Sequence, residues 1–285
     1  MSPPYLASRT AARAGAPREP YADGLRLVLI IFGVLLIAAF LAPLAMGDKM
    51  VFRWDVLKAP GVGAIAKFDQ VYLMAAGILA LVFGLVPLAT VPRGALAAVL
   101  GLAPLALHFV VDDLKNAPAI KWQEIVGFVG LLTLVPGLLL REEYRSQLLP
   151  RILTTVGALC VLLPLLVPSG GGDPPIKTII DAVGKSPGKL KVLAILQLWP
   201  VIIAALSLLC WLPAPSSAAA KILAWLVIIT AVVYGYTSLL IAGHLGAAIK
   251  ANLNEALLGG WVIAAWIAFI GYGAATVLGK NLEHS

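Results

Sequence analysis

Apolar residues fill long runs of this sequence, and polar and charged residues are confined to the stretches between those runs. A helix rises 1.5 Å per residue, so about 20 apolar residues cross the roughly 30 Å hydrocarbon layer of a membrane. Applied along the chain, this rule predicts about eight transmembrane helices. The predicted spans are residues 27–46, 71–91, 95–111, 124–140, 152–167, 192–212, 218–242 and 257–278.

The pattern of one stretch occurs twice. Residues 54–91 open with a short amphipathic run, break at a Pro-Gly pair and continue, after a basic residue, into a long apolar span. Residues 176–212 repeat this order. We therefore predict an all-α integral membrane protein of two tandem four-helix units. Because four is an even number of crossings, the units should point the same way through the bilayer, related by a pseudo-twofold axis along the membrane normal.

The polar stretches divide this protein into parts. Residues 1–24 contain Pro and Arg but almost no branched aliphatic residues, which is typical of a disordered tail. The most charged run, residues 141–151, lies near the middle of the chain and is expected to link the two units. The predicted units are therefore residues 25–140 and 152–285.

The distribution of charge predicts an orientation. Nearly every Arg falls in the tail or in the short connections on one side, whereas the longer loops on the other side carry mostly Lys balanced by acidic residues. The positive-inside rule therefore favours both termini in the cytoplasm. Amphipathic segments at residues 50–58 and 176–183 are expected on the extracytoplasmic surface. The Ala-, Leu- and Arg-rich composition fits a bacterial inner membrane.

Composition supports the membrane prediction. The chain has 285 residues, of which 61% are hydrophobic and 12% charged, whereas soluble proteins have about 25% charged residues. The formal net charge is +7, but the basic residues are scattered singly, without the basic helix or aromatic-rich patch of a nucleic-acid-binding protein. The partners expected are membrane lipids, and other membrane helices or a second copy of the chain. Both cysteines lie in apolar spans and are expected to pack as small side chains without a disulfide.

Motifs for catalysis are missing from the sequence. There is no Gly-x-Ser-x-Gly, His-Glu-x-x-His, Cys-x-x-Cys or phosphate-binding glycine loop, so we expect neither enzymatic activity nor a cofactor. The chain carries no motif that resembles a known family. The spans contain almost no ionisable residue at mid-depth, which argues against a proton- or sodium-coupled pump, because such pumps need a buried charge.

One predicted span carries a cluster of polar residues. Thr230, Tyr234, Thr237 and Ser238 lie close together in the seventh span, and Gln197 lies in the sixth. These five residues are the candidates for lining a ligand path or pore. The alternative is that the hydroxyl groups donate hydrogen bonds within their own helix or across one helix pair.

Three residues are weak candidates for a metal site. His108 and Asp112 are four residues apart at the end of the third span, so on a continued helix they would share a face. His244, at the matching place in the other unit, could supply a third ligand. The alternative, which we favour, is that these residues pair with each other or with lipid headgroups at the membrane surface, and we expect no metal.

Small residues recur at four-residue spacing in the eighth span. Gly260, Ala264 and Ala268 follow one face, and Gly271 and Ala275 follow another. Small residues at this spacing let helix backbones approach closely. The eighth span should therefore be central in the fold or lie at an oligomer interface.

Proline residues interrupt six of the predicted spans. They are Pro43, Pro87, Pro104, Pro136, Pro164 and Pro200. Each removes a backbone hydrogen bond and bends its helix. Pro136 and Pro200 lie far enough from the span ends to be the main candidates for kinks.

The pattern favours a non-enzymatic membrane protein that acts as an accessory, scaffold or sensor-like subunit. A channel or facilitative carrier with a site between the two halves is the alternative, based on the polar residues of the seventh span. An enzyme working at the lipid interface through the histidines is a third hypothesis.

Overall fold

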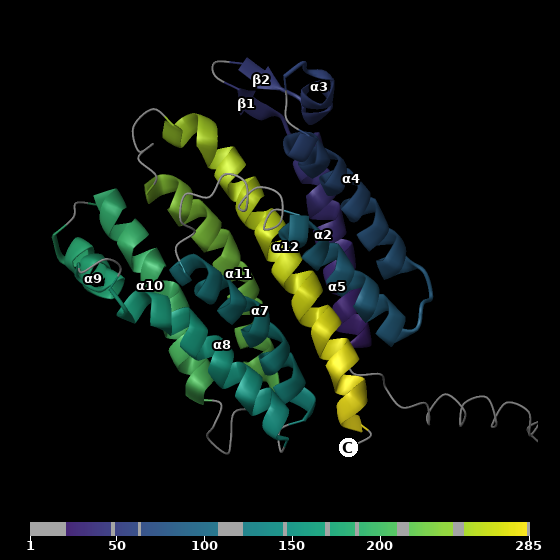
Figure 1. Ribbon diagram of the computed structural model, residues 1–285, viewed down its shortest axis with the longest axis vertical. Helices are drawn as coiled ribbons and strands as arrows, with labels where there is room; N and C mark the ends of the chain where they lie inside the picture. Colours follow the sequence, from purple (N-terminus) through teal and green to yellow (C-terminus); the bar gives the residue numbers. More distant parts are fainter. Residues whose placement is uncertain are drawn as a thin grey trace, which may run out of the picture.

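The computed structural model describes residues 21–46, 49–61, 64–107, 122–144, 147–168, 172–185, 188–209, 217–241 and 248–283. Within these ranges the protein is helical apart from one two-stranded hairpin, which confirms the all-α prediction. The long helices lie side by side with their axes roughly aligned (Figure 1).

Eight helices of at least 18 residues occur in the described part of the chain, one at the place of each predicted span. They are α2 (Ala22–Leu41), α4 (Ala64–Leu85), α5 (Thr90–Leu107), α7 (Trp122–Glu143), α8 (Leu148–Leu166), α10 (Gly188–Leu208), α11 (Ser217–Ile241) and α12 (Ala248–Glu283). Helix α2 begins inside the predicted tail, and only residues 144–147 of the predicted linker separate α7 from α8.

Three of the described helical stretches are long and apolar enough to cross a membrane by length and composition. They are Ala22–Leu41, Leu148–Leu166 and Trp261–Leu282. Shorter apolar stretches lie in α4, α7 and α11, at Gln70–Leu85, Val126–Arg141 and Ala218–Thr230. Apolar helices of this kind are typical of a membrane protein.

The end of the first span differs from the prediction. Helix α2 ends at Leu41, and the chain then forms the antiparallel hairpin of β1 (Leu44–Met46) and β2 (Lys49–Val51). The cause is Pro43, because proline disfavours the helical conformation of the residue before it, and Ala42 is extended at φ −68° and ψ 137°. Helix α3 (Arg53–Lys58) follows, so only part of the predicted amphipathic segment at 50–58 is helical.

The turn between the second and third spans also differs. The predicted spans 71–91 and 95–111 leave residues 92–94 as the turn, but α5 begins at Thr90 and includes all three of these residues. Proline is tolerated in the first turn of a helix, where its missing N–H has no helical acceptor. The turn lies at residues 86–89, so neither Pro87 nor Pro43 interrupts a helix. Proline does lie inside α5, α7, α8 and α10, as predicted, at Pro104, Pro136, Pro164 and Pro200.

Helix α12 lies at the centre of the fold. It packs against α2 and α5 on one side and against α7 and α11 on the other (Figure 1). Aromatic residues join it to its neighbours: the ring centroids of Phe32 and Phe269 are 6.2 Å apart, and those of Trp225 and Tyr272 are 6.1 Å apart. Its spacing of small residues allowed either a central position or an oligomer interface, and the structure has the first.

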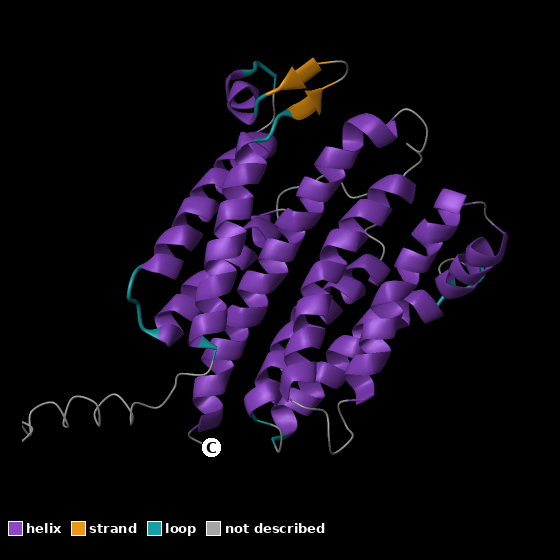
Figure 2. Ribbon diagram, turned by 180° about the vertical axis from the view of Figure 1, so that it is seen from behind, coloured by secondary structure: helices purple, strands orange, loops and turns teal. Residues whose placement is uncertain are grey.

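The other helices surround this centre. Helix α7 packs against α8 and α11, and α10 packs against α8, α11 and the short helix α9 (Pro175–Lys185). The hairpin and α3 lie beyond the end of the bundle opposite the C-terminal end of α12 (Figures 1 and 2).

Candidate functional site

Thr230 is the predicted path residue whose side chain the structure describes. It is buried, and its Oγ1 donates a hydrogen bond of 2.7 Å to the carbonyl oxygen of Leu226, one turn earlier in α11. This is the alternative in which the hydroxyl is satisfied by its own helix. The side chains of the other four candidates, Tyr234, Thr237, Ser238 and Gln197, lie outside the described part of α11 and α10.

Three further buried hydroxyl groups behave in the same way. Thr154, Ser207 and Thr276 each donate a hydrogen bond of 2.7 Å to the carbonyl oxygen four residues earlier. Such bonds satisfy a polar group inside an apolar bundle without a second helix or a ligand. Each of these hydroxyl groups therefore donates its hydrogen bond within its own helix.

The metal candidates His108, Asp112 and His244 lie outside the described residues. Among the residues that the structure describes, no group of three or more His, Cys, Asp or Glu is placed to hold a metal ion. Cys160 in α8 is a half-buried free thiol, and Cys210 lies outside the described ranges.

The small residues of α12 face its neighbours. Four of the five predicted packing residues are buried, namely Ala264, Ala268, Gly271 and Ala275. The burial of Gly260 is not described. A Cβ atom added at Gly271 would lie 2.8 Å from the Cβ of Val135 in α7, closer than atoms can pack. The close approach of α12 to α7 therefore requires glycine at this position.

A second glycine contact, which we did not predict from the sequence, joins α12 to α5. A Cβ at Gly273 would lie 2.9 Å from the amide nitrogen of Ala98, and one at Gly101 would lie 2.8 Å from the carbonyl oxygen of Trp266. Gly94 and Gly101 are seven residues apart, so they share one face of α5. The sequence signal was this seven-residue spacing.

The same arrangement recurs in two other helix pairs. In α4, Gly77 and Gly84 face α2, and a Cβ at Gly77 would lie 3.0 Å from the carbonyl oxygen of Gly33. In α7, Gly130 and Gly137 face α8, where a Cβ at Gly157 would lie 2.7 Å from the amide nitrogen of Leu134. Each pair combines two glycines seven residues apart with one glycine of its antiparallel neighbour. Backbone-to-backbone packing of this kind stabilises helices in lipid, where apolar side chains gain little from burial.

Arginine side chains close the C-terminal end of α4. Arg93 is buried, and its Nε and Nη2 donate hydrogen bonds of 2.9 Å to the carbonyl oxygens of Phe83 and Val86. Arg26 Nε donates one of 3.2 Å to the carbonyl oxygen of Gly84. The last carbonyls of a helix have no partner in that helix and carry the negative end of its dipole. Two positive side chains therefore stabilise this end.

Arg53 has the same role at the opposite end of the bundle. Its Nε donates a hydrogen bond of 2.6 Å to the carbonyl oxygen of Ala39 in the last turn of α2, and its Nη1 donates one of 2.6 Å to Gln70 Oε1 in α4. The guanidinium therefore holds α3 across the ends of α2 and α4. The two residues next to Arg53 in the sequence, Phe52 and Trp54, stack their rings on each other with centroids 4.5 Å apart.

Two more polar contacts connect segments far apart in the chain. The Tyr21 hydroxyl donates a hydrogen bond of 2.7 Å to the carbonyl oxygen of Leu139, which joins the start of α2 to α7. Gln147 Nε2 donates one of 3.2 Å to the carbonyl oxygen of Leu282, near the end of α12. Both contacts lie at the end of the bundle that carries the C-terminus of α12.

The outward faces of the long helices are apolar along their length. On α8 they include six side chains spaced three or four residues apart and between 44% and 64% exposed, namely Leu148, Ile152, Val156, Leu159, Leu163 and Leu166. The exposed charged side chains of the described long helices lie within five residues of a helix end. Continuous apolar surface of this extent is typical of a surface in contact with lipid.

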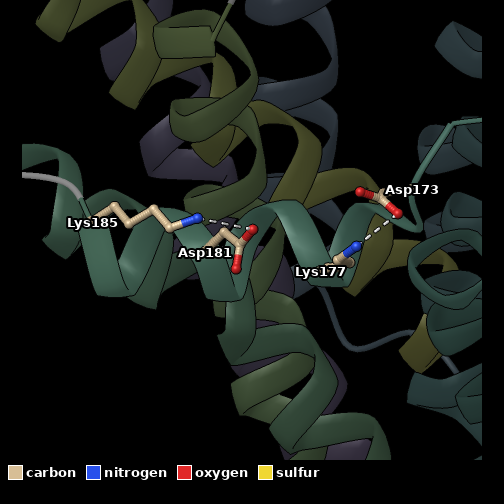
Figure 3. Close-up of polar contacts among 4 residues, drawn as sticks. All are labelled: Asp173, Lys177, Asp181 and Lys185. Atoms are coloured by element: carbon tan, nitrogen blue, oxygen red, sulfur yellow. Dashed lines mark hydrogen bonds and ion pairs between the residues drawn. The ribbon is translucent and has the colours of Figure 1, made fainter.

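Two ion pairs involve α9 and Asp173, which lies two residues before the start of this helix. Lys177 Nζ is 2.9 Å from Asp173 Oδ1, and Lys185 Nζ is 3.5 Å from Asp181 Oδ2 (Figure 3). Ile179 is buried on the opposite face, so α9 is amphipathic, as predicted for residues 176–183.

No known protein family, curated protein or solved structure matches this chain.

Proposed function

We propose that the protein is an eight-span protein of a bacterial inner membrane that works, without catalysis, as an accessory, scaffold or sensor-like subunit. The observation that carries this proposal is the apolar outward surface of the long helices, which leaves lipid or other membrane helices as their neighbours. The buried hydroxyl groups of Thr154, Ser207, Thr230 and Thr276, each bonded within its own helix, support a bundle that binds no polar ligand there.

Helix packing supports the tandem architecture. If α2, α3, α4, α5 and α7 correspond to α8, α9, α10, α11 and α12, five contacting pairs have a contacting counterpart. The matched pairs are α2–α4 with α8–α10, α4–α5 with α10–α11, α3–α4 with α9–α10, α5–α12 with α11–α7, and α2–α12 with α8–α7. The contact of α11 with α12 is the exception, because α5 and α7 make no comparable contact in the described residues.

The positions of the basic residues support cytoplasmic termini. Four of the five arginines in the described ranges, Arg26, Arg93, Arg141 and Arg151, belong to helix ends on the side where α12 finishes, whereas α3 at the other end carries Arg53 and Lys58. Basic side chains near span ends favour the cytoplasmic face. This orientation places α3 and its stacked aromatic rings on the extracytoplasmic surface.

The scaffold function can be tested by photo-crosslinking in the native membrane. p-Benzoylphenylalanine placed singly at the lipid-facing positions Ile31, Val82, Val99 and Val156 should give discrete protein adducts on at least one helix face. Purified protein in liposomes is the matched control: an adduct that persists there is a second copy of the chain, and one that disappears is another subunit. Adducts with lipid alone at all four positions would contradict the scaffold function.

A channel or facilitative carrier with its site between the two units is the second candidate. Pro136 lies where α7 contacts α12, with its Cδ 3.8 Å from a Cβ placed at Gly271. Because proline leaves the carbonyl group of residue 132 without its helical donor, α7 can bend where it meets the other unit. If this candidate holds, Thr237→Leu and Ser238→Leu should abolish glycerol or KCl flux in proteoliposomes. Unchanged flux in both variants would remove the candidate.

A further inference from the structure

We infer that the two four-helix units exchange their fourth helices, so that each unit binds the fourth helix of the other. This inference rests on the tandem architecture proposed above. By sequence, α7 is the fourth helix of the first unit, yet it packs against α8 and α11 of the second. By sequence, α12 is the fourth helix of the second unit, yet it packs against α2 and α5 of the first as well as against α11 of its own unit.

The exchange is reciprocal in the contacts that α7 and α12 make with the other unit, and α12 in addition keeps its contact with α11 of its own unit. The contact of α12 with α5 has its counterpart in the contact of α7 with α11, and that of α12 with α2 has its counterpart in that of α7 with α8. The exchanged helices also meet each other, where Gly271 of α12 lies against Val135 of α7. This contact is therefore the place where a pseudo-twofold axis would pass between the units.

The lengths of the connections explain why exchange occurs. Only residues 144–147 join α7 to α8, so these helices must be antiparallel neighbours. Fourteen residues, 108–121, separate α5 from α7, and they can span up to about 46 Å. The short connection keeps α7 beside the second unit. The long connection allows α7 to lie away from the other helices of the first unit.

The surface of α2, α4 and α5, which α7 would cover if each unit kept its own fourth helix, fits α12 closely. Gly94 and Gly101 of α5 accept the α12 backbone at Gly273 and Trp266, and Phe32 of α2 meets Phe269 edge to face. Tyr72 of α4 adds an aromatic contact with Trp266, with ring centroids 6.4 Å apart. Three helices of the first unit therefore recognise one helix of the second, and neither unit completes its bundle without the other.

Photo-crosslinking of the full chain tests the exchange. p-Azidophenylalanine replaces Phe32 in one variant and Tyr72 in another, since it preserves the ring that faces α12. A protease site inserted between Gly170 and Gly171 separates α2–α8 from α9–α12 after irradiation in membranes. The expected result at both positions is a band that keeps the mass of the uncut chain on a denaturing gel.

Phe52 is the matched control position, because its aromatic partner Trp54 belongs to the same fragment. The two fragments of this variant should separate after cleavage. Separation of the fragments in the Phe32 and Tyr72 variants as well, or a joined product of twice the mass of the chain, would overturn exchange within one chain. A carbonate wash of the membranes separates failure of the proposed function from failure of the exchange. Protein that the wash removes from the membrane contradicts the membrane-subunit proposal, independently of whether the fragments separate.

Discussion

The glycine contact between α7 and α8 makes a quantitative prediction about stability. A Cβ at Gly157 would lie 2.7 Å from the amide nitrogen and 2.8 Å from the Cα of Leu134, both backbone atoms that cannot rotate away. In the same helix pair, a Cβ at Gly127 would meet only Pro164 Cγ, at an ordinary 3.8 Å. Gly157→Ala and Gly127→Ala therefore each add one methyl group to the interface between α7 and α8. The methyl group clashes with backbone atoms at position 157 and does not clash at position 127.

The magnitude follows from this geometry. Carbon atoms pack at about 3.5–4.0 Å, so Gly157→Ala must move the helices apart by roughly 0.7 Å, and such a gap forfeits about a quarter to a half of the local attraction. Overpacking of this kind costs about 1–3 kcal/mol. Both substitutions gain about 1 kcal/mol of helix propensity, which cancels between them. Gly157→Ala should therefore be less stable than Gly127→Ala by about 1–3 kcal/mol.

The assay is unfolding in dodecylmaltoside micelles titrated with SDS, followed by circular dichroism and tryptophan fluorescence. Gly127→Ala should unfold at the same SDS fraction as the unsubstituted protein or a higher one, and Gly157→Ala at a lower one than Gly127→Ala. If the free energies of unfolding of the two variants agree within about 0.5 kcal/mol, backbone contact at Gly157 does not determine the stability of this pair, and the argument from close packing is wrong.

Three other substitutions test the helix ends, the buried hydroxyl groups and the surface. Arg93→Met should lower the free energy of unfolding by about 2–4 kcal/mol in the same assay, because it removes two charge-assisted hydrogen bonds, whereas the exposed control Lys280→Met should change it little; equal effects would contradict the capping role. Thr230→Val should leave glycerol and KCl flux in proteoliposomes unchanged, since the hydroxyl bonds to its own helix, and a changed flux would show that Thr230 lines a path. Lys177→Ala should change the free energy of unfolding by less than about 0.5 kcal/mol, because its ion pair is solvent-exposed, and a larger loss in urea or SDS would reveal a structural role.

The candidate helix-packing residues could be predicted in part. The four-residue spacing of Gly260, Ala264 and Ala268, and of Gly271 and Ala275, follows from the sequence. It indicates that α12 has close neighbours, because small residues permit close approach. The partner faces of α5, α7 and α8 were missed, although pairs of glycines seven residues apart are visible in α5 and α7. Such a pair marks a face of one helix but says nothing about which helix lies against it.

The sequence alone determined where helices form. Each apolar run carries its own length and helix-forming residues, and these are local properties that need no partner. Pro43 is a local signal too, which stops α2 at Leu41 where hydropathy alone extends the span. The amphipathic pattern of α9 was read correctly for the same reason, since its apolar face is spaced by the helix itself.

Only the tertiary structure decided which helices are neighbours and how their ends are satisfied. In lipid, an apolar face is equally compatible with any other helix or with acyl chains, so hydrophobic pattern cannot choose a partner. The packing of α7 on α8 and α12 on α5 depends on connection lengths and on complementary glycines far apart in sequence. Arg53 and Arg93 likewise look like ordinary loop charges until folding brings their guanidinium groups to the carbonyl ends of α2 and α4, because a long side chain takes its partner from three-dimensional proximity.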